Sequence, residues 1–182
     1  MKIIGIDPGT NILGYAVIES NGSNLSALDS VGVVQLQKYD NHYDKLKKIF
    51  EKVSVLIETY QPDEMAIEAP FYGKNVQSML KLGRAQGVAI AAAMMLAIPV
   101  TEYQPRKVKQ SVTGNGNASK EQVAAMLQNM FKLENIPSYF DATDALAVAV
   151  CHHLQNRLLP SGRGKHKDWS AFLRENPDKI KK

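Results

Sequence analysis

The first 70 residues alternate between short apolar runs and polar turns, a pattern that predicts several strands and one helix. The third run is rich in β-branched residues and follows Asn21-Gly22, a pair that favours a tight turn. Apolar residues then recur at helical spacing until Gln61-Pro62, and a short apolar run follows. The predicted elements are strands at 2–6, 14–19 and 30–37, a helix at 44–60 and a strand at 65–69.

Helical spacing dominates the rest of the chain. One long predicted helix is apolar on all sides from Val88 to Leu96, so it needs cover from the core or from a second subunit, and the sequence leaves both open. Ser119 and Gln122 have the spacing of a capping box that opens a helix. Antiparallel strands followed by strands alternating with helices predict an α/β fold with a five-stranded mixed sheet flanked by helices. The remaining predicted elements are helices at 75–97, 106–112, 120–132 and 141–158 and a strand at 100–103.

The composition is that of an ordinary globular protein, with 45% hydrophobic and 22% charged residues among 182. We expect one domain over 1–158 and a basic, flexible tail over 159–182. The single cysteine, Cys151, lies in an apolar stretch, which is typical of a buried thiol in a reducing compartment. With no cleavable signal and no apolar run long enough to span a bilayer, we expect a soluble, cytoplasmic protein without membrane contact.

Charge is distributed unevenly around a net value of +4. Residues 1–73 carry six basic and ten acidic side chains, whereas 74–120 carry seven basic and one acidic. Residues 157–182 carry eight basic and three acidic side chains. This layout favours a polyanion held by basic surface and delivered to an acidic site, although a random mixture of surface charge is the alternative.

Asp7 follows the first apolar strand and precedes Pro8-Gly9, so on its own it is an ordinary turn former. Glu68 ends another predicted strand, where by alternation it shares a face with Ala66. A solvent-facing glutamate is the alternative explanation for that position. Both carboxylates are expected where a strand ends, so both can project from one edge of the sheet.

Asp141 and Asp144 are spaced i, i+3 at the start of a predicted helix and therefore point the same way. Helix capping alone explains acids there. Their small apolar neighbours, however, indicate a helix packed closely on the sheet, which would turn both acids toward its edge. Four carboxylates gathered there would repel one another unless a cation lay among them, and oxygen ligands suit Mg²⁺ or Mn²⁺.

The ordered set of these motifs resembles the RuvC family of Holliday-junction resolvases, which have a ribonuclease H-like fold. The resemblance spans roughly residues 2–155. It is carried by Gly5-Ile6-Asp7-Pro8-Gly9, Gly14-Tyr15, Ala66-Ile67-Glu68, Lys81-Leu82-Gly83, Val108-Lys109-Gln110, Lys120 with Gln122-Val123, and Asp141-Ala142-Thr143-Asp144-Ala145-Leu146-Ala147.

The resemblance implies a homodimeric endonuclease of DNA recombination and repair that cuts two strands of a four-way junction symmetrically, leaving 5′-phosphate and 3′-hydroxyl ends. Asp7, Glu68, Asp141 and Asp144 would hold two Mg²⁺ ions per subunit, for which Mn²⁺ would substitute. A branch-migration helicase complex is the partner that the family implies.

The resemblance also implies DNA contacts. Lys109 and Lys120 match basic residues that face the scissile phosphate, although a solvated lysine at a helix start also explains Lys120. An aromatic wedge against bases matches Phe71, with Tyr72 as the other candidate ring. Gln86 stands where a basic residue is common in relatives, which puts one phosphate contact in doubt. Further candidate contacts are Lys74, Arg84, Arg106 and Lys107.

Three other functions are weighed against junction cleavage. An actin-like or sugar-kinase phosphotransferase also opens with a strand, an aspartate and a glycine turn, but it needs two such domains. A related ribonuclease H-like nuclease could act on other structured nucleic acids. A non-catalytic junction-binding protein would need the fold without the complete acid set.

Overall fold

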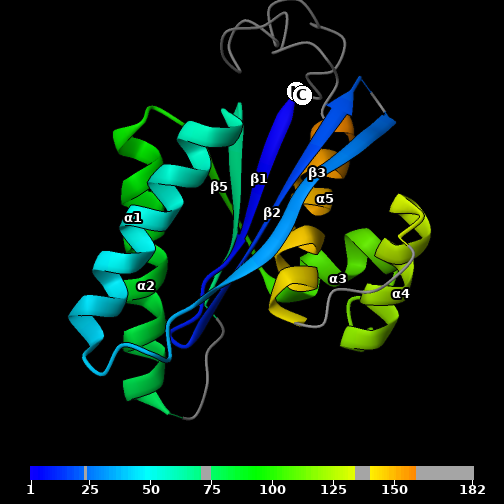
Figure 1. Ribbon diagram of the computed structural model, residues 1–182. Coiled ribbons are helices and arrows are strands. Elements are labelled where there is room, and N and C mark those ends of the chain that lie inside the picture. The colour runs from blue at the N-terminus through cyan, green and yellow to red at the C-terminus, as the bar shows by residue number, and fades with distance from the viewer. Residues whose placement is uncertain (23, 71–74, 134–139, 159–182) are drawn as a thin grey trace, which may run out of the picture.

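The computed structural model describes residues 1–22, 24–70, 75–133 and 140–158 (Figure 1). Its centre is a single five-stranded sheet with the order β3-β2-β1-β4-β5. The first three strands pair antiparallel, whereas β4 and β5 run parallel to β1, as the sequence predicted for a mixed sheet. The strands are β1 (Lys2–Asp7), β2 (Ile12–Asn21), β3 (Asn24–Gln35), β4 (Glu64–Glu68) and β5 (Val100–Tyr103).

Helices cover both faces of the sheet, as Figure 1 shows, with α1 and α2 on one side and α3, α4 and α5 on the other. Each face has its own core, because alternate residues of β1 point to opposite sides. None of the helices in the described ranges is long and apolar enough to cross a membrane. The helices are α1 (His42–Tyr60), α2 (Val76–Met95), α3 (Pro105–Thr113), α4 (Lys120–Phe131) and α5 (Phe140–Leu158).

The predicted elements are all present, with two informative differences. Strand β3 begins at Asn24 rather than near residue 30, because its first half, in which Leu25 and Leu28 pack against the core, extends the pairing with β2 through two register shifts. The apolar end of α2 is only half covered: Ala92 and Ala93 are buried, whereas Met94 and Met95 are 68% and 75% exposed. The tail predicted at 159–182 lies outside the described residues and stays a prediction.

Candidate active site

Asp7 and Glu68 lie side by side at the end of the sheet where the carboxyl ends of β1 and β4 meet. They end two neighbouring parallel strands, which pair up to Ile6 and Ile67. Alternation places both acids on the α5 face, because Ala66 packs in the α5 core while Ile67 packs in the other. The predicted shared face of Ala66 and Glu68 is therefore confirmed, and both carboxylates are half-buried rather than solvent-facing.

Helix α5 reaches this end of the sheet because glycines let it approach the sheet backbone. A Cβ atom on Gly5 would lie 2.2 Å from the Ala145 carbonyl oxygen, and one on Gly14 would lie 1.9 Å from the Asp141 carbonyl oxygen. Gly14 also pairs with Asp7 across β1 and β2. The start of α5, with Asp141 in its first turn and Asp144 just after it, therefore lies directly on the strand beside Asp7, as the small residues of this helix predicted.

The electrostatics show how close the acids are. Burial raises the pKa of Asp7 well above its ordinary value, and the charges of Glu68, Asp144 and Asp141 raise it further, partly offset by Lys120. Burial and then Asp144 raise the pKa of Glu68 to about 7, against the opposing effect of Lys120 and Lys109. Mutual repulsion among acids and a low local dielectric produce such shifts. Groups with strongly perturbed pKa values are typical of functional sites.

Two lysines face the carboxylates across a cleft of about 280 Å³. Lys120 donates a hydrogen bond of 2.5 Å to Oδ2 of Asp144, and it is the first residue of α4. Its position is fixed by the capping box that the sequence predicted, since Ser119 accepts from the Gln122 backbone and Gln122 accepts from the Ser119 backbone. Lys109 of α3 and Glu68 line the same cleft.

The donor set fits a divalent cation although it does not yet enclose one. Within the part of the chain that the structure describes, no three His, Cys, Asp or Glu side chains form a metal-binding group. The four acids supply only oxygen ligands, which Mg²⁺ and Mn²⁺ prefer. The raised pKa values of Asp7 and Glu68 show negative charge that protein cations leave incompletely balanced. The Lys120 ammonium lies against Asp144, where a cation would otherwise bind.

Of the other predicted DNA contacts, the three that the structure describes do not line this cleft. Arg84 lies on α2 and affects the pKa of His42, so it belongs to the opposite helical layer. Arg106 and Lys107 are exposed on α3, and the Arg106 side chain closes over Gly116. Phe71, Tyr72 and Lys74 lie outside the described residues.

Gln86 has a role that the sequence did not indicate. Its side chain is 7% exposed and donates 2.7 Å to Oε2 of Glu102, with a longer contact of 3.4 Å to the carbonyl oxygen of Glu68. It ties α2 to the ends of β4 and β5.

A polar hydrogen-bond network between α5 and strands β4 and β5 was also not predicted from the sequence. His152 of α5 makes a hydrogen bond of 2.9 Å with the Tyr103 hydroxyl and pairs on its other side with Glu64. Asn156 donates to the same Glu64 oxygen at 3.0 Å. Burial raises the pKa of Tyr103 to about 12. The network joins α5 to β4 and β5, so it fixes the helix that carries two of the acids.

Comparison with known proteins gives consistent results. A family model described as crossover junction endodeoxyribonuclease RuvC matches residues 3–152. RuvC of Cytophaga hutchinsonii is 59% identical over 98% of this chain and 88% of its own length. RuvC of Porphyromonas gingivalis is 54% identical over 98% of this chain and 96% of its own.

A solved structure shows the same architecture. Thermus thermophilus RuvC in complex with Holliday junction substrate superposes with a TM-score of 0.81 at 30% identity, covering 87% of this chain and 96% of that one. The likeness confirms the expected ribonuclease H-like fold.

Proposed function

The chain belongs to the RuvC family of crossover junction endodeoxyribonucleases, and we propose that Asp7, Glu68, Asp141 and Asp144 form its catalytic centre. The protein is a nuclease that resolves four-way, or Holliday, junctions in DNA recombination and repair. One observation carries the assignment of the site: two strand ends and one helix start bring four acids into electrostatic contact beside a cleft with two lysines.

The four carboxylates would hold two Mg²⁺ ions per subunit, with Mn²⁺ as a substitute, and these would activate the attacking water and stabilise the leaving 3′ oxygen. Lys109 and Lys120 face the same cleft and are suited to neutralise the scissile phosphate. Lys120 pairs with Asp144 in this structure, so Asp144 would be free to ligate a cation once the Lys120 ammonium is drawn to a bound phosphate. The products carry 5′-phosphate and 3′-hydroxyl ends.

The test is a paired cleavage assay with Mg²⁺ on a four-way junction and on linear duplex, for the wild type and Asp7→Asn. We expect the wild type to cut only the junction and Asp7→Asn to bind it without cutting. Equal cleavage of linear duplex would favour a less specific ribonuclease H-like nuclease. Junction binding without cleavage by the wild type would favour a non-catalytic binding protein, and an active Asp7→Asn would remove the carboxylate assignment.

We also propose that two copies pair through α2, so that two sites cut two strands symmetrically. The outer face of this helix carries Leu80 and Met94, 51% and 68% exposed, with Gly87 between them at seven-residue spacing. A Cβ atom on Gly87 would meet nothing within 4 Å, so a second helix has room to approach. Leu80→Glu with Met94→Glu should give a monomer by sedimentation, whereas Val55→Glu, an exposed apolar residue of α1, should leave the dimer intact.

The remaining proposals rest on the family alone. A cytoplasmic location and a branch-migration helicase partner fit a DNA-acting enzyme of this kind. Co-purification of the untagged helicase with the tagged protein on junction DNA tests the second of these. The tail at 159–182 is basic enough to act as an electrostatic tether, and its removal should weaken junction binding more at low salt than at high salt.

A further inference from the structure

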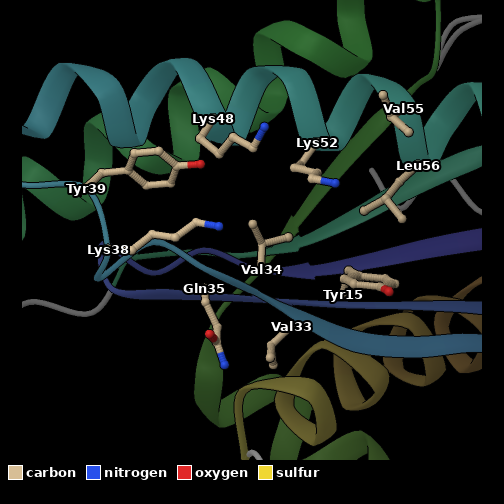
Figure 2. A pocket seen from close by; sticks show the side chains of 10 residues that line it. All are labelled: Tyr15, Val33, Val34, Gln35, Lys38, Tyr39, Lys48, Lys52, Val55 and Leu56. Carbon is tan, nitrogen blue, oxygen red and sulfur yellow. The ribbon is translucent and has the colours of Figure 1, made fainter.

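A groove of about 240 Å³ lies between α1 and β3, on the face of the sheet opposite α5. Figure 2 shows Lys48 and Lys52 reaching down from α1 and Lys38 reaching in from the loop after β3, so that three ammonium groups border one space. We call it the lysine groove, after Lys38, Lys48 and Lys52. Nothing in the catalytic assignment uses it.

The groove has more positive charge than its own acids balance. Lys48 pairs with Glu51 at 3.0 Å. Lys38 lies 5.6 Å from the centre of the Tyr39 ring, a cation–π contact rather than an ion pair. Among the described residues, the Lys52 ammonium makes no hydrogen bond or ion pair. Two of the three cations are therefore available to an anion.

The floor of the groove is apolar and built by a specific strand arrangement. Gly32 of β3 lets the Tyr15 ring lie over it, because a Cβ there would come within 2.8 Å of the Tyr15 hydroxyl. Val34 points up toward α1 beside that ring, as Figure 2 shows. The buried face of α1 packs further inside, through Ile49 and Val53, and leaves this outer strip of the sheet uncovered. Apolar floor and cationic rim together suit a sugar–phosphate chain.

The lysine groove lies at the catalytic end of the sheet. Asp7 pairs with Gly14, and Gly14 pairs with Val33, so these three residues form one row across β1, β2 and β3. With strands about 4.8 Å apart, Val33 lies about 10 Å from Asp7, or roughly three base steps of 3.4 Å along DNA. Lys38 follows β3 beyond that row. The carboxylates lie on the α5 face and the groove on the opposite face, so a strand held at the carboxylates reaches the groove by passing around this end of the sheet.

We propose that the lysine groove binds phosphodiester groups of a junction arm that passes around the end of the sheet from the carboxylate cleft. The proposal rests on the proposed function, since it assumes that DNA occupies the carboxylate cleft. Each ammonium that meets a phosphate releases a counterion and strengthens binding without reading sequence. A free nucleotide offers the same phosphate chemistry. The junction arms of the bound substrate are long polyanions held on the same molecule, which favours the DNA strand over an acidic peptide.

The test compares two charge reversals on one helix, Lys52→Glu and Lys47→Glu. Lys47 is exposed and does not line the groove, so both variants change the net charge equally. Junction affinity is measured with EDTA present. Lys52→Glu should raise the Kd about tenfold and Lys47→Glu less than about twofold, and Lys52→Gln should reduce the salt slope of binding by about one. Unchanged thermal unfolding checks that each variant is folded.

Equal weakening by Lys52→Glu and Lys47→Glu would overturn the proposal, because it would leave only the overall charge of the protein. A titration with deoxyadenosine monophosphate separates the second source: nucleotide binding that Lys52→Glu abolishes, with junction affinity unchanged, would also overturn it. Because affinity is measured without cleavage, this result is independent of the catalytic proposal. The catalytic proposal fails only if Asp7→Asn still cuts the junction in the metal-dependent assay.

Discussion

The two faces of the sheet are packed in opposite ways. On the α5 face, glycines and alanines bring helix and strand backbones into direct contact, with a Cβ on Gly5 only 2.8 Å from the Ala149 Cβ. On the α1 and α2 face, large side chains such as Ile49, Ile57 and Met65 fill the space between the layers. We call the α5 face the close face and the α1 and α2 face the thick face. The close face carries the four acids, and the thick face carries the lysine groove and the proposed dimer surface.

This difference shows what each face requires. Backbone contact leaves α5 one position on the sheet, so the carboxylates of its first turn keep their geometry relative to Asp7. A layer of large side chains can repack when one of them changes shape. The close face should therefore be sensitive to a single methyl group, and the thick face should tolerate it.

The largest effect is expected for Gly5→Ala. The added methyl would lie 2.2 Å from the Ala145 carbonyl oxygen, which is backbone and cannot rotate away. We expect the free energy of unfolding to fall by about 3 kcal/mol or more and junction cleavage to fall with it. Urea denaturation measures the first and the junction assay the second. A fall of less than about 1 kcal/mol in the free energy of unfolding would show that α5 can shift to accommodate the methyl group.

A pH effect of intermediate size is expected at Glu68 in metal-free protein. Its folded-state pKa of about 7 lies above its ordinary value of 4.5, so the folded state holds an extra proton between these values. The resulting stability is present at low pH and is lost as pH rises through about 7. We expect the Tm to fall by about 5 °C between about pH 5.5 and about pH 8.

Glu68→Gln is the matched control for this effect, since it removes the titrating group and keeps the shape. It should flatten the pH dependence and raise the Tm at about pH 8 above that of the wild type. Added Mg²⁺ at the same pH should stabilise the wild type and not the variant. A steeper fall in the variant than in the wild type would rule out Glu68 as the cause.

A smaller effect is expected for Ile49→Val on the thick face. Ile49 is 1% exposed, and removal of one buried methylene typically costs about 1 kcal/mol. Cleavage should stay at the wild-type rate, because the change is on the face opposite the carboxylates. A loss of activity as large as that of Gly5→Ala would show that the two faces are mechanically coupled.

The smallest effect is expected for Gly87→Ala. This glycine has open space around it on α2, and alanine is favoured over glycine inside a helix by about 0.5–1 kcal/mol. Measured in the Leu80→Glu, Met94→Glu background, which is expected to be monomeric, the free energy of unfolding should therefore stay unchanged or rise slightly, in contrast to the same substitution at Gly5. Destabilisation by more than about 1 kcal/mol would mean that the α2 surface is already tightly packed.

Local sequence signals predicted most of the fold because they act over a few residues. The bounds of β5 and the capping box at Ser119 follow from neighbours within three positions. The acids at 7, 68, 141 and 144 were identified because each ends a strand or starts a helix. Their detailed geometry, including the ion pair between Lys120 and Asp144, depends on how α4 packs against α5. Local sequence patterns could not predict it.

Features assembled from distant segments could not be predicted. The lysine groove combines residues from β2, β3 and α1, which meet only through strand pairing and the placement of the helix. The Gln86 side chain points inward, to Glu102 and the carbonyl oxygen of Glu68, rather than outward to solvent. That direction depends on the packing of α2 on β4. The aromatic wedge predicted at Phe71 stays a prediction.

The close contact between α5 and the β1–β2 pair also has a consequence for protein synthesis. Asp7 leaves the ribosome among the first residues, whereas Asp141 and Asp144 follow much later, on a helix that packs against both β1 and β2. A nascent chain therefore contains at most two of the four acids until residue 141 has been added. If these four acids form the catalytic centre as proposed, nuclease activity requires that residue 144 has been added and that α5 has packed on the sheet.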